Sequence, residues 1–93
     1  MNSLSAVGAT SPVMINSGYF SLDISGTFVA TITLQRAPST IAQADLVTSD
    51  YMDVEDYTAE TVDTGIEGSR HWYRAEIKTG AYTSGTATIR ITQ

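Results

Sequence analysis

The chain contains no cysteine, so neither disulfide bonds nor thiolate metal sites hold the fold, and a cytosolic origin fits better than a small secreted scaffold. Its single histidine, His71, cannot alone build a zinc site or complete a familiar catalytic triad. Long apolar runs are also missing, and the first residues lack the basic segment of a signal peptide. We therefore expect no membrane span and a core that depends on packing alone.

Basic residues are few. Five Lys and Arg face ten Asp and Glu, which gives a net charge of -5. A nucleic-acid surface needs clustered positive charge, and these five residues are scattered, so we expect no nucleic-acid partner. A chain of 93 residues forms one domain of marginal stability, for which oligomerisation or docking on a larger body is an economical source of extra stability.

Alternation of apolar and polar side chains is the strongest pattern present. Residues 73–78 and 87–92 alternate on either side of a glycine-rich turn, which predicts two antiparallel strands with one buried face. The apolar positions are Tyr73, Ala75, Ile77, Ala87, Ile89 and Ile91. Residues 26–36 form a second alternating stretch with Phe28, Ala30, Ile32 and Leu34 on one face. Two such faces can pack together as a sandwich.

Similar short stretches recur between turn signals, and helical periodicity is almost absent. The pattern predicts an all-β fold, a small Ig-like antiparallel β-sandwich of about seven strands over residues 13–93. Residues 37–50 interrupt the strands. They predict either a short helical face of Ile41, Ala44 and Val47 or an irregular loop with one buried aliphatic side chain.

Residues 1–12 are small and uncharged, and we expect a flexible N-terminal arm. Either the arm is an ordinary frayed terminus or it becomes ordered only against a neighbouring subunit. Threonines line the solvated faces of the strands at 31, 33, 86, 88 and 92, where their hydroxyl groups stay in water. Edges of that kind accept an added strand unless they are short or twisted away.

Acidic residues are concentrated in the middle of the chain, at Asp45, Asp50, Asp53, Glu55, Asp56, Glu60, Asp63 and Glu67. Their spacing does not follow a calcium loop, and neighbouring strand residues point to opposite faces, so a solvated acidic face is favoured over a cation site. A two-carboxylate hydrolase needs a cleft that a sandwich of this size has little room to form. We expect no catalytic residue, no metal and no cofactor.

Trp72 is the main candidate for a contact surface. If Tyr73 packs inward, then Trp72 points outward, unless a bulge at His71 rotates it into the core. An outward Trp72 marks a contact surface or a groove covered by a loop, and with Tyr19, Tyr73 and Tyr82 it could form a platform for sugar rings. Arginines are available to pair with the acidic residues, within one subunit or across an interface. The predicted interface residues are Trp72, Arg74, Tyr82, Arg36 and Arg90.

The ordered segments GYFSLDISGTFVATITLQR, DVEDYTAET and YRAEIKTGAYTSGTATIRITQ resemble a recurrent type of small tailed-phage virion protein. The shared pattern is GTF-x4-LQR, then DV-xx-YT, then YR and TG-x-YTSG-x3-R, and it covers most of residues 18–93. Residues 37–50 depart from the pattern, in which a shorter turn with a Trp is usual.

The resemblance implies a non-enzymatic Ig-like sandwich that is incorporated in many copies into a phage particle, as a capsid decoration or cement module or at the head-to-tail region. Its partners would be other virion proteins, namely the major capsid protein or head-to-tail proteins, and further copies of itself. Its location would be the virion, assembled in the cytoplasm of the bacterial host. The alternative is an Ig-like module that binds a host-surface glycan or belongs to the tail.

Overall fold

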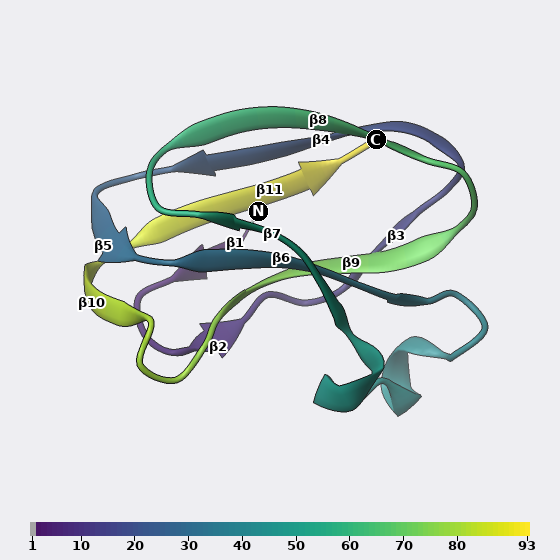
Figure 1. Ribbon diagram of the computed structural model, residues 1–93, viewed down its shortest axis with the longest axis horizontal. Coiled ribbons are helices and arrows are strands. Elements are labelled where there is room, and N and C mark those ends of the chain that lie inside the picture. Colours follow the sequence, from purple (N-terminus) through teal and green to yellow (C-terminus); the bar gives the residue numbers. More distant parts are fainter. Residues whose placement is uncertain (1) are drawn as a thin grey trace.

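Strands dominate the computed structural model, which describes residues 2–93 (Figure 1). The chain has eleven strand segments rather than about seven, because five pieces of two to four residues accompany six longer strands. The strands are β1 (Asn2–Leu4), β2 (Gly8–Ala9), β3 (Val13–Ile15), β4 (Gly18–Ser25), β5 (Phe28–Ala30), β6 (Ile32–Pro38), β7 (Met52–Tyr57), β8 (Thr61–Glu67), β9 (His71–Ile77), β10 (Tyr82–Gly85) and β11 (Ala87–Thr92).

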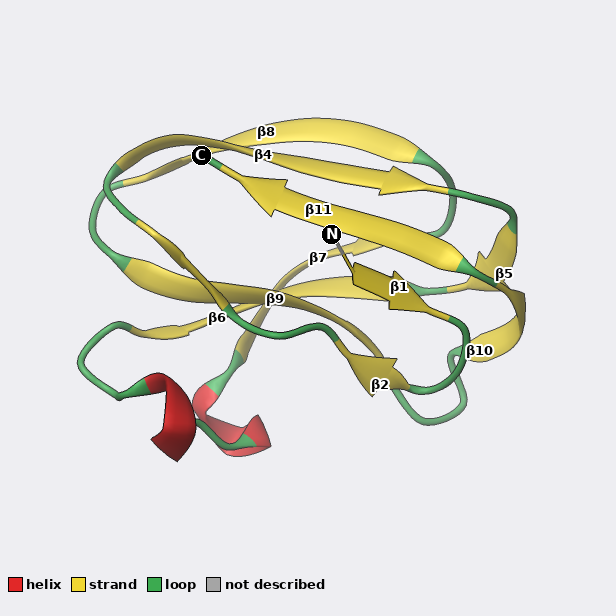
Figure 2. Ribbon diagram, turned by 180° about the vertical axis from the view of Figure 1, so that it is seen from behind, coloured by secondary structure: helices red, strands yellow, loops and turns green. Residues whose placement is uncertain are grey.

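The strands form two main antiparallel sheets, so the predicted all-β sandwich is confirmed (Figure 2). The first sheet has the order β1-β11-β4-β8. The second has the order β2-β9-β6-β7, and β3 also pairs with β9. A two-stranded ribbon of β5 and β10 lies at one end of the sandwich (Figure 1). Thus β7 and β8, which follow one another in the chain, are edge strands of different sheets.

The core lies between the two sheets and follows the alternation of the strands. The most deeply buried large side chains are Ile15, Leu22, Ile32, Ile77 and Ile89. On β9, the inward positions Tyr73, Ala75 and Ile77 are at most 2% exposed, as predicted. Burial of such side chains stabilises the fold by about 1.5–3 kcal/mol each before the entropic cost of ordering is counted. The phenyl ring of Phe20 packs against Tyr73 with ring centroids 4.8 Å apart.

The predicted hairpin between residues 73–78 and 87–92 is wrong. β9 pairs with β6, whereas β11 pairs with β4 in the other sheet. The connecting residues carry a strand of their own, β10, which pairs with β5. The two apolar faces therefore face each other across the core instead of lying side by side. In immunoglobulin domains, by contrast, the last two strands share a sheet.

The alternating stretch of residues 26–36 is also divided, because the chain leaves the ribbon at Thr31 and enters the second sheet as β6. Phe28 and Ala30 are partly buried against the core, whereas Ile32 and Leu34 are fully inside it. Residues 37–50 complete β6 at Pro38 and then contain two single 3-10 turns, Gln43–Asp45 and Thr48–Asp50, instead of a longer helix. Val47, a member of the helical face that the sequence predicted, is 57% exposed.

The N-terminal residues differ from the flexible arm that we expected; only Met1 lies outside the described residues. β1 pairs with β11, and β2 pairs with β9, so the segment contributes to both sheets. Leu4 is 9% exposed and belongs to the core cluster. The hydroxyl oxygen of Thr10, which is buried, accepts a hydrogen bond from the backbone N–H of Ala75 at 3.0 Å. Two strand pairings, the buried Leu4 and the Thr10 hydrogen bond together fix this segment on the sandwich.

Candidate functional site

The outer face of the second sheet carries a layer of polar side chains. Thr33 and Gln35 of β6 point away from the core, yet each is only 3% exposed. The expectation that the Thr33 hydroxyl stays in water is therefore wrong. Its Oγ1 donates instead to Asp56 Oδ1 of β7 at 2.7 Å. Long side chains from β7 and β9 cover the central strand, and hydrogen bonds offset the cost of burying its polar groups.

Gln35 is the centre of this layer. Its Nε2 donates to Asp53 Oδ1 at 2.9 Å and to Glu76 Oε1 at 3.0 Å, while its Oε1 accepts from Arg74 Nε at 2.8 Å. Asp53 also pairs with Lys78, and these contacts hold the pKa of the Asp53 carboxyl below its ordinary value. The layer is a hydrogen-bonded network that joins β6, β7 and β9 and leaves no free donor on Gln35, although the buried Nη2 of Arg74 has no hydrogen-bond partner.

Trp72 and Arg74 point outward from β9, in agreement with the alternation, and residues 37–51 cover both. The indole Nε1 of Trp72 donates to the carbonyl of Ile41 at 2.9 Å. The guanidinium carbon of Arg74 lies 3.7 Å from the centroid of the Tyr51 ring, a cation–π contact. Its Nη2 lies 3.5 Å from Glu76 Oε2. A loop therefore covers the outward Trp72 and Arg74, so they do not form an open contact surface.

A buried carboxylate lies at one end of the sandwich. Glu67 is 6% exposed and accepts a hydrogen bond from the hydroxyl of Tyr73. Arg36 Nη1 lies 3.5 Å and His71 Nδ1 lies 3.3 Å from Glu67 Oε2. Burial raises the pKa of this carboxyl, but the Tyr73 hydrogen bond, His71 and Arg36 outweigh burial and leave it below its ordinary value of 4.5. Burial and the Glu67 bond together raise the pKa of Tyr73 to about 12.

A second tyrosine connects the two edge strands. The hydroxyl of Tyr57 on β7 lies 2.8 Å from Glu55 Oε2 and 3.0 Å from Asp63 Oδ2 of β8. Burial first, and then these two carboxylates, raise the pKa of Tyr57 above its ordinary value. A hydroxyl group has one proton to donate, so it cannot satisfy both carboxylates at once. This side of the sandwich is thus rich in carboxylate acceptors.

The β8 edge is bordered by large exposed apolar side chains. Val62 and Ile66 of β8 are 81% and 69% exposed. Tyr19 of β4 lies opposite Ile66 in the register and is 74% exposed. Next to Val62, a hollow of about 320 Å³ is lined by Asp23, Ser25, Thr88 and Arg90. Tyr19 and Ile66 are neighbours, and Val62 lies four residues further along the same edge strand. Exposed apolar side chains along an open sheet edge mark an interaction surface.

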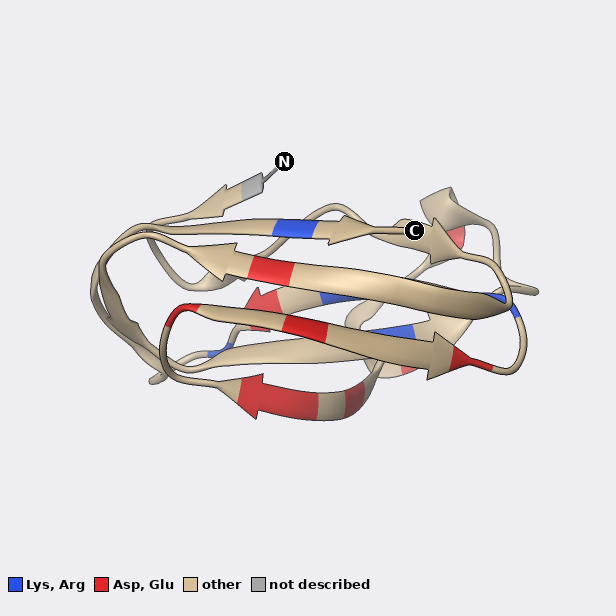
Figure 3. Cartoon of the chain, turned by 90° about the horizontal axis from the view of Figure 1, so that it is seen from above, with Lys and Arg blue, Asp and Glu red and all other residues tan. Residues whose placement is uncertain are grey.

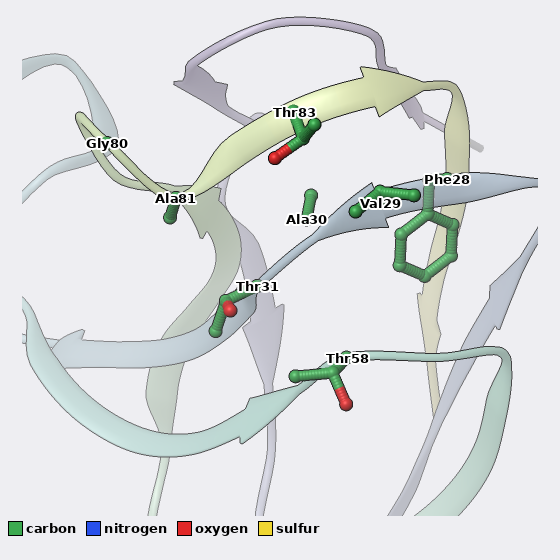
Figure 4. Close-up of a pocket in the computed structure, with 8 residues that line it drawn as sticks. All are labelled: Phe28, Val29, Ala30, Thr31, Thr58, Gly80, Ala81 and Thr83. Atoms are coloured by element: carbon green, nitrogen blue, oxygen red, sulfur yellow. The ribbon is translucent and has the colours of Figure 1, made fainter.

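Another hollow, of about 410 Å³, lies between the β5–β10 ribbon and the connection from β7 to β8 (Figure 4). Its walls are formed by Phe28, Val29, Ala30, Thr31, Thr58, Gly80, Ala81 and Thr83. None of these side chains is ionisable, so the hollow offers hydroxyl and backbone groups but no acid, base or charged ligand. Within residues 2–93, no group of three or more His, Cys, Asp or Glu side chains is arranged to hold a metal ion.

The five predicted interface residues do not share one surface. Trp72 and Arg74 lie together under residues 37–51, whereas Arg36 contacts Glu67 at the end of the sandwich. The hydroxyl of Tyr82 donates within its own ribbon to the carbonyl of Gly85 at 2.9 Å. Arg90 is exposed on the outer face of the first sheet. The arginine pairing with the acidic run is confirmed for Arg36 only.

The aromatic platform for sugar rings is not assembled either. Tyr73 is buried between the sheets, and Tyr19 and Trp72 lie on the outer faces of opposite sheets. Conversely, no pattern in the sequence predicted the central position of Gln35 or the burial of Glu67. A single polar residue at an outward strand position carries no signal that its neighbours will cover it.

No described helix has the length and apolar character of a bilayer span. Comparisons with protein-family models, with curated proteins and with solved structures found no significant match to this chain.

Proposed function

We propose that this protein is a non-enzymatic structural component of a tailed-phage virion that docks in many copies on the particle. Its partners are the major capsid or head-to-tail proteins and further copies of itself. The proposal combines the resemblance of residues 18–93 to small virion proteins with a surface suited to docking. The observation that carries it is the open edge of β8, beside which Tyr19, Val62 and Ile66 are each more than two-thirds exposed.

These three side chains argue for a partner on energetic grounds. Exposed apolar side chains that are scattered singly need no explanation, but three of them beside one open sheet edge indicate a surface that a partner covers. Covering one such side chain on association is worth about 1.5–3 kcal/mol before the entropic cost of binding. A small domain gains stability when it binds neighbouring subunits. In a symmetric shell every copy makes the same contacts, so every copy gains the same stabilisation. Such a role requires no catalytic residue.

The geometry favours docking over the alternative of glycan binding. A sugar-binding platform needs an open aromatic face with free polar groups nearby. The indole N–H of Trp72 is already bonded to Ile41, and the hydroxyl of Tyr82 is bonded to Gly85. The exposed ring of Tyr19 lies instead beside Ile66, in an apolar setting that suits a protein partner.

The test uses particles of the phage that encodes the chain, purified on a density gradient and quantified by mass spectrometry. We expect the chain to migrate with the particles in many copies. Val62→Asp combined with Ile66→Asp should reduce incorporation, because it places charge where apolar contact is needed. Val29→Asp is the matched control, since Val29 is also exposed, at 57%, but lies on the ribbon. Absence from the particles, or equal incorporation of both variants, contradicts the proposal.

A further inference from the structure

We infer that the free edge of β8 binds an extended segment of another protein whose side chains alternate between apolar and basic. The segment would add to the first sheet as a fifth strand beyond β8. This inference rests on the proposed docking role and specifies the chemistry of the partner. Three features of the edge carry it: its regular backbone, the apolar residues on one face and the carboxylates on the other.

The backbone of β8 is prepared for strand addition. It pairs with β4 over all seven residues, from Gly18↔Glu67 to Ile24↔Thr61, without a register shift. No described strand pairs with its other side, so that side presents N–H and C=O groups to a further strand. The N–H of Thr64 is the exception, because it donates to Asp63 Oδ1 at 2.8 Å and would have to exchange that bond for one to the added strand. The other nearby edge, β7, is protected: its pairing with β6 shifts between Leu34 and Gln35, and it carries three acidic residues. Of the two, only β8 is a regular template.

The outward face of β8 specifies apolar positions in the added strand. Val62 and Ile66 lie on this face four residues apart, which is about 13 Å along a strand. Thr64, between them, is also exposed. In a sheet, side chains directly opposite one another interact most strongly. Apolar residues at every second position of the added strand would therefore cover Val62 and Ile66.

The inward face of the same edge specifies basic positions. Asp63 lies opposite Leu22, whose side chain is in the core, so Asp63 points toward the opening between the sheets. There its Oδ2 shares the single proton of the Tyr57 hydroxyl with Glu55, while its Oδ1 accepts a hydrogen bond from the backbone N–H of Thr64 at 2.8 Å. Figure 3 shows the acidic residues gathered on β7 and β8. Residues 37–69 contain no Lys or Arg, and the ion pairs of the described residues place Lys78 on Asp53 and Arg36 on Glu67 but no basic side chain on Glu55 or Asp63.

A second copy of β8 does not fit this edge. Pairing β8 with β8 would bring Asp63 and Glu67 of each copy against the same acidic edge, and like charges across a strand pair destabilise it. The net charge of -5 adds a general repulsion between copies. Basic side chains on the inner positions of a different chain would instead be attracted to Asp63 and Glu55.

The experiment titrates the intact isotope-labelled chain with synthetic nine-residue peptides and follows backbone amides by NMR. The probe peptide alternates valine and lysine. One control alternates valine and aspartate, and another carries a central proline, which removes a backbone donor and disfavours a strand. We expect the valine–lysine peptide to shift the amides of residues 61–67 and slow their hydrogen exchange, while both controls bind weakly.

Variants then test the apolar outward face and the acidic inward face of β8 separately. Val62→Thr keeps the β-branched shape but weakens apolar contact, and Val29→Thr is its control on the ribbon. Glu55→Gln with Asp63→Asn should weaken binding about two- to thirtyfold, since two surface charge pairs of about 0.2–1 kcal/mol each are lost. Asp45→Asn, an exposed acidic residue on a 3-10 turn, should leave binding unchanged.

Binding that leaves residues 61–67 unshifted, or equal binding of the proline peptide, overturns the inference. So does self-association of the free chain that Val62→Thr abolishes, because that result makes a second copy the occupant. If the chain is present in particles but the peptide does not bind β8, the inference fails and the proposed function stands. If the peptide binds β8 but the chain is absent from particles, the proposed function fails and the β8 edge remains a strand-binding surface.

Discussion

Replacing Gly65 by alanine should destabilise the fold, because the Phe20 ring on the neighbouring strand occupies the space that the new methyl group needs. Gly65 lies on β8 directly opposite Phe20 of β4. A Cβ atom added there would lie 2.7 Å from Cζ and 2.9 Å from Cε1 of the Phe20 ring, closer than real contacts allow. The ring has little freedom to withdraw, because its other neighbour is the buried ring of Tyr73, 4.8 Å away.

The expected loss of stability is the balance of two opposing effects. Overpacking a core costs about 1–3 kcal/mol, whereas replacing glycine by alanine gains about 0.4–1 kcal/mol by restricting the unfolded chain. We expect Gly65→Ala to lower the free energy of unfolding by about 1–2 kcal/mol. Gly68→Ala is the matched control: an added Cβ meets nothing within 4 Å, and neither glycine has a positive φ.

Urea unfolding followed by tryptophan fluorescence gives the free energy of unfolding of each variant. Combining Gly65→Ala with Phe20→Leu should cost less than the sum of the single changes, because the smaller side chain relieves the clash. Equal effects of Gly65→Ala and Gly68→Ala would refute the steric argument, and so would strict additivity in the double variant.

Two further predictions concern the buried carboxylate and the N-terminal strand. Although burial raises it, the folded-state pKa of Glu67 lies below its ordinary value of 4.5, so its stabilisation is complete above that pH and is lost as the pH falls through the folded-state pKa. Tyr73→Phe should therefore lower the free energy of unfolding by about 1.5–3 kcal/mol at pH 7 and by less at pH 3; an equal loss at both would contradict this. Leu4→Ala should cost about 2–3 kcal/mol by urea unfolding, whereas Val7→Ala, at an exposed site, should stay within about 0.5 kcal/mol. If Leu4→Ala left the free energy of unfolding unchanged, the N-terminal residues would be a flexible arm, as the sequence predicted.

The alternation of side chains predicted the inner and outer faces well. Tyr73 and Ile77 are buried, and Trp72 points outward, as expected for a regular strand. The prediction worked because strand geometry turns successive side chains to opposite faces whatever the strand pairs with. The prediction of which strands pair was wrong, because β9 and β11 have the alternation of a hairpin but belong to different sheets.

The candidate sites were harder to predict for the same reason. Arg36 and Arg74 were both expected to pair with the acidic run; Arg36 contacts Glu67 as expected, whereas the Nε of Arg74 donates to Gln35 instead. Which polar side chain becomes covered depends on neighbours far away in the chain. For example, 41 residues separate Gln35 from Glu76, whose carboxylate accepts its amide proton.

By itself, the sequence determined that this protein is an all-β sandwich with a core of alternating aliphatic side chains and an acidic middle segment. Those properties are local, since they depend on composition and on the two-residue period of a strand. Only the tertiary structure decided how the strands divide between the sheets, how the N-terminal residues join both, and that β8 is left as a regular open edge. Pairing partners are chosen by contacts between distant segments, which no local pattern encodes.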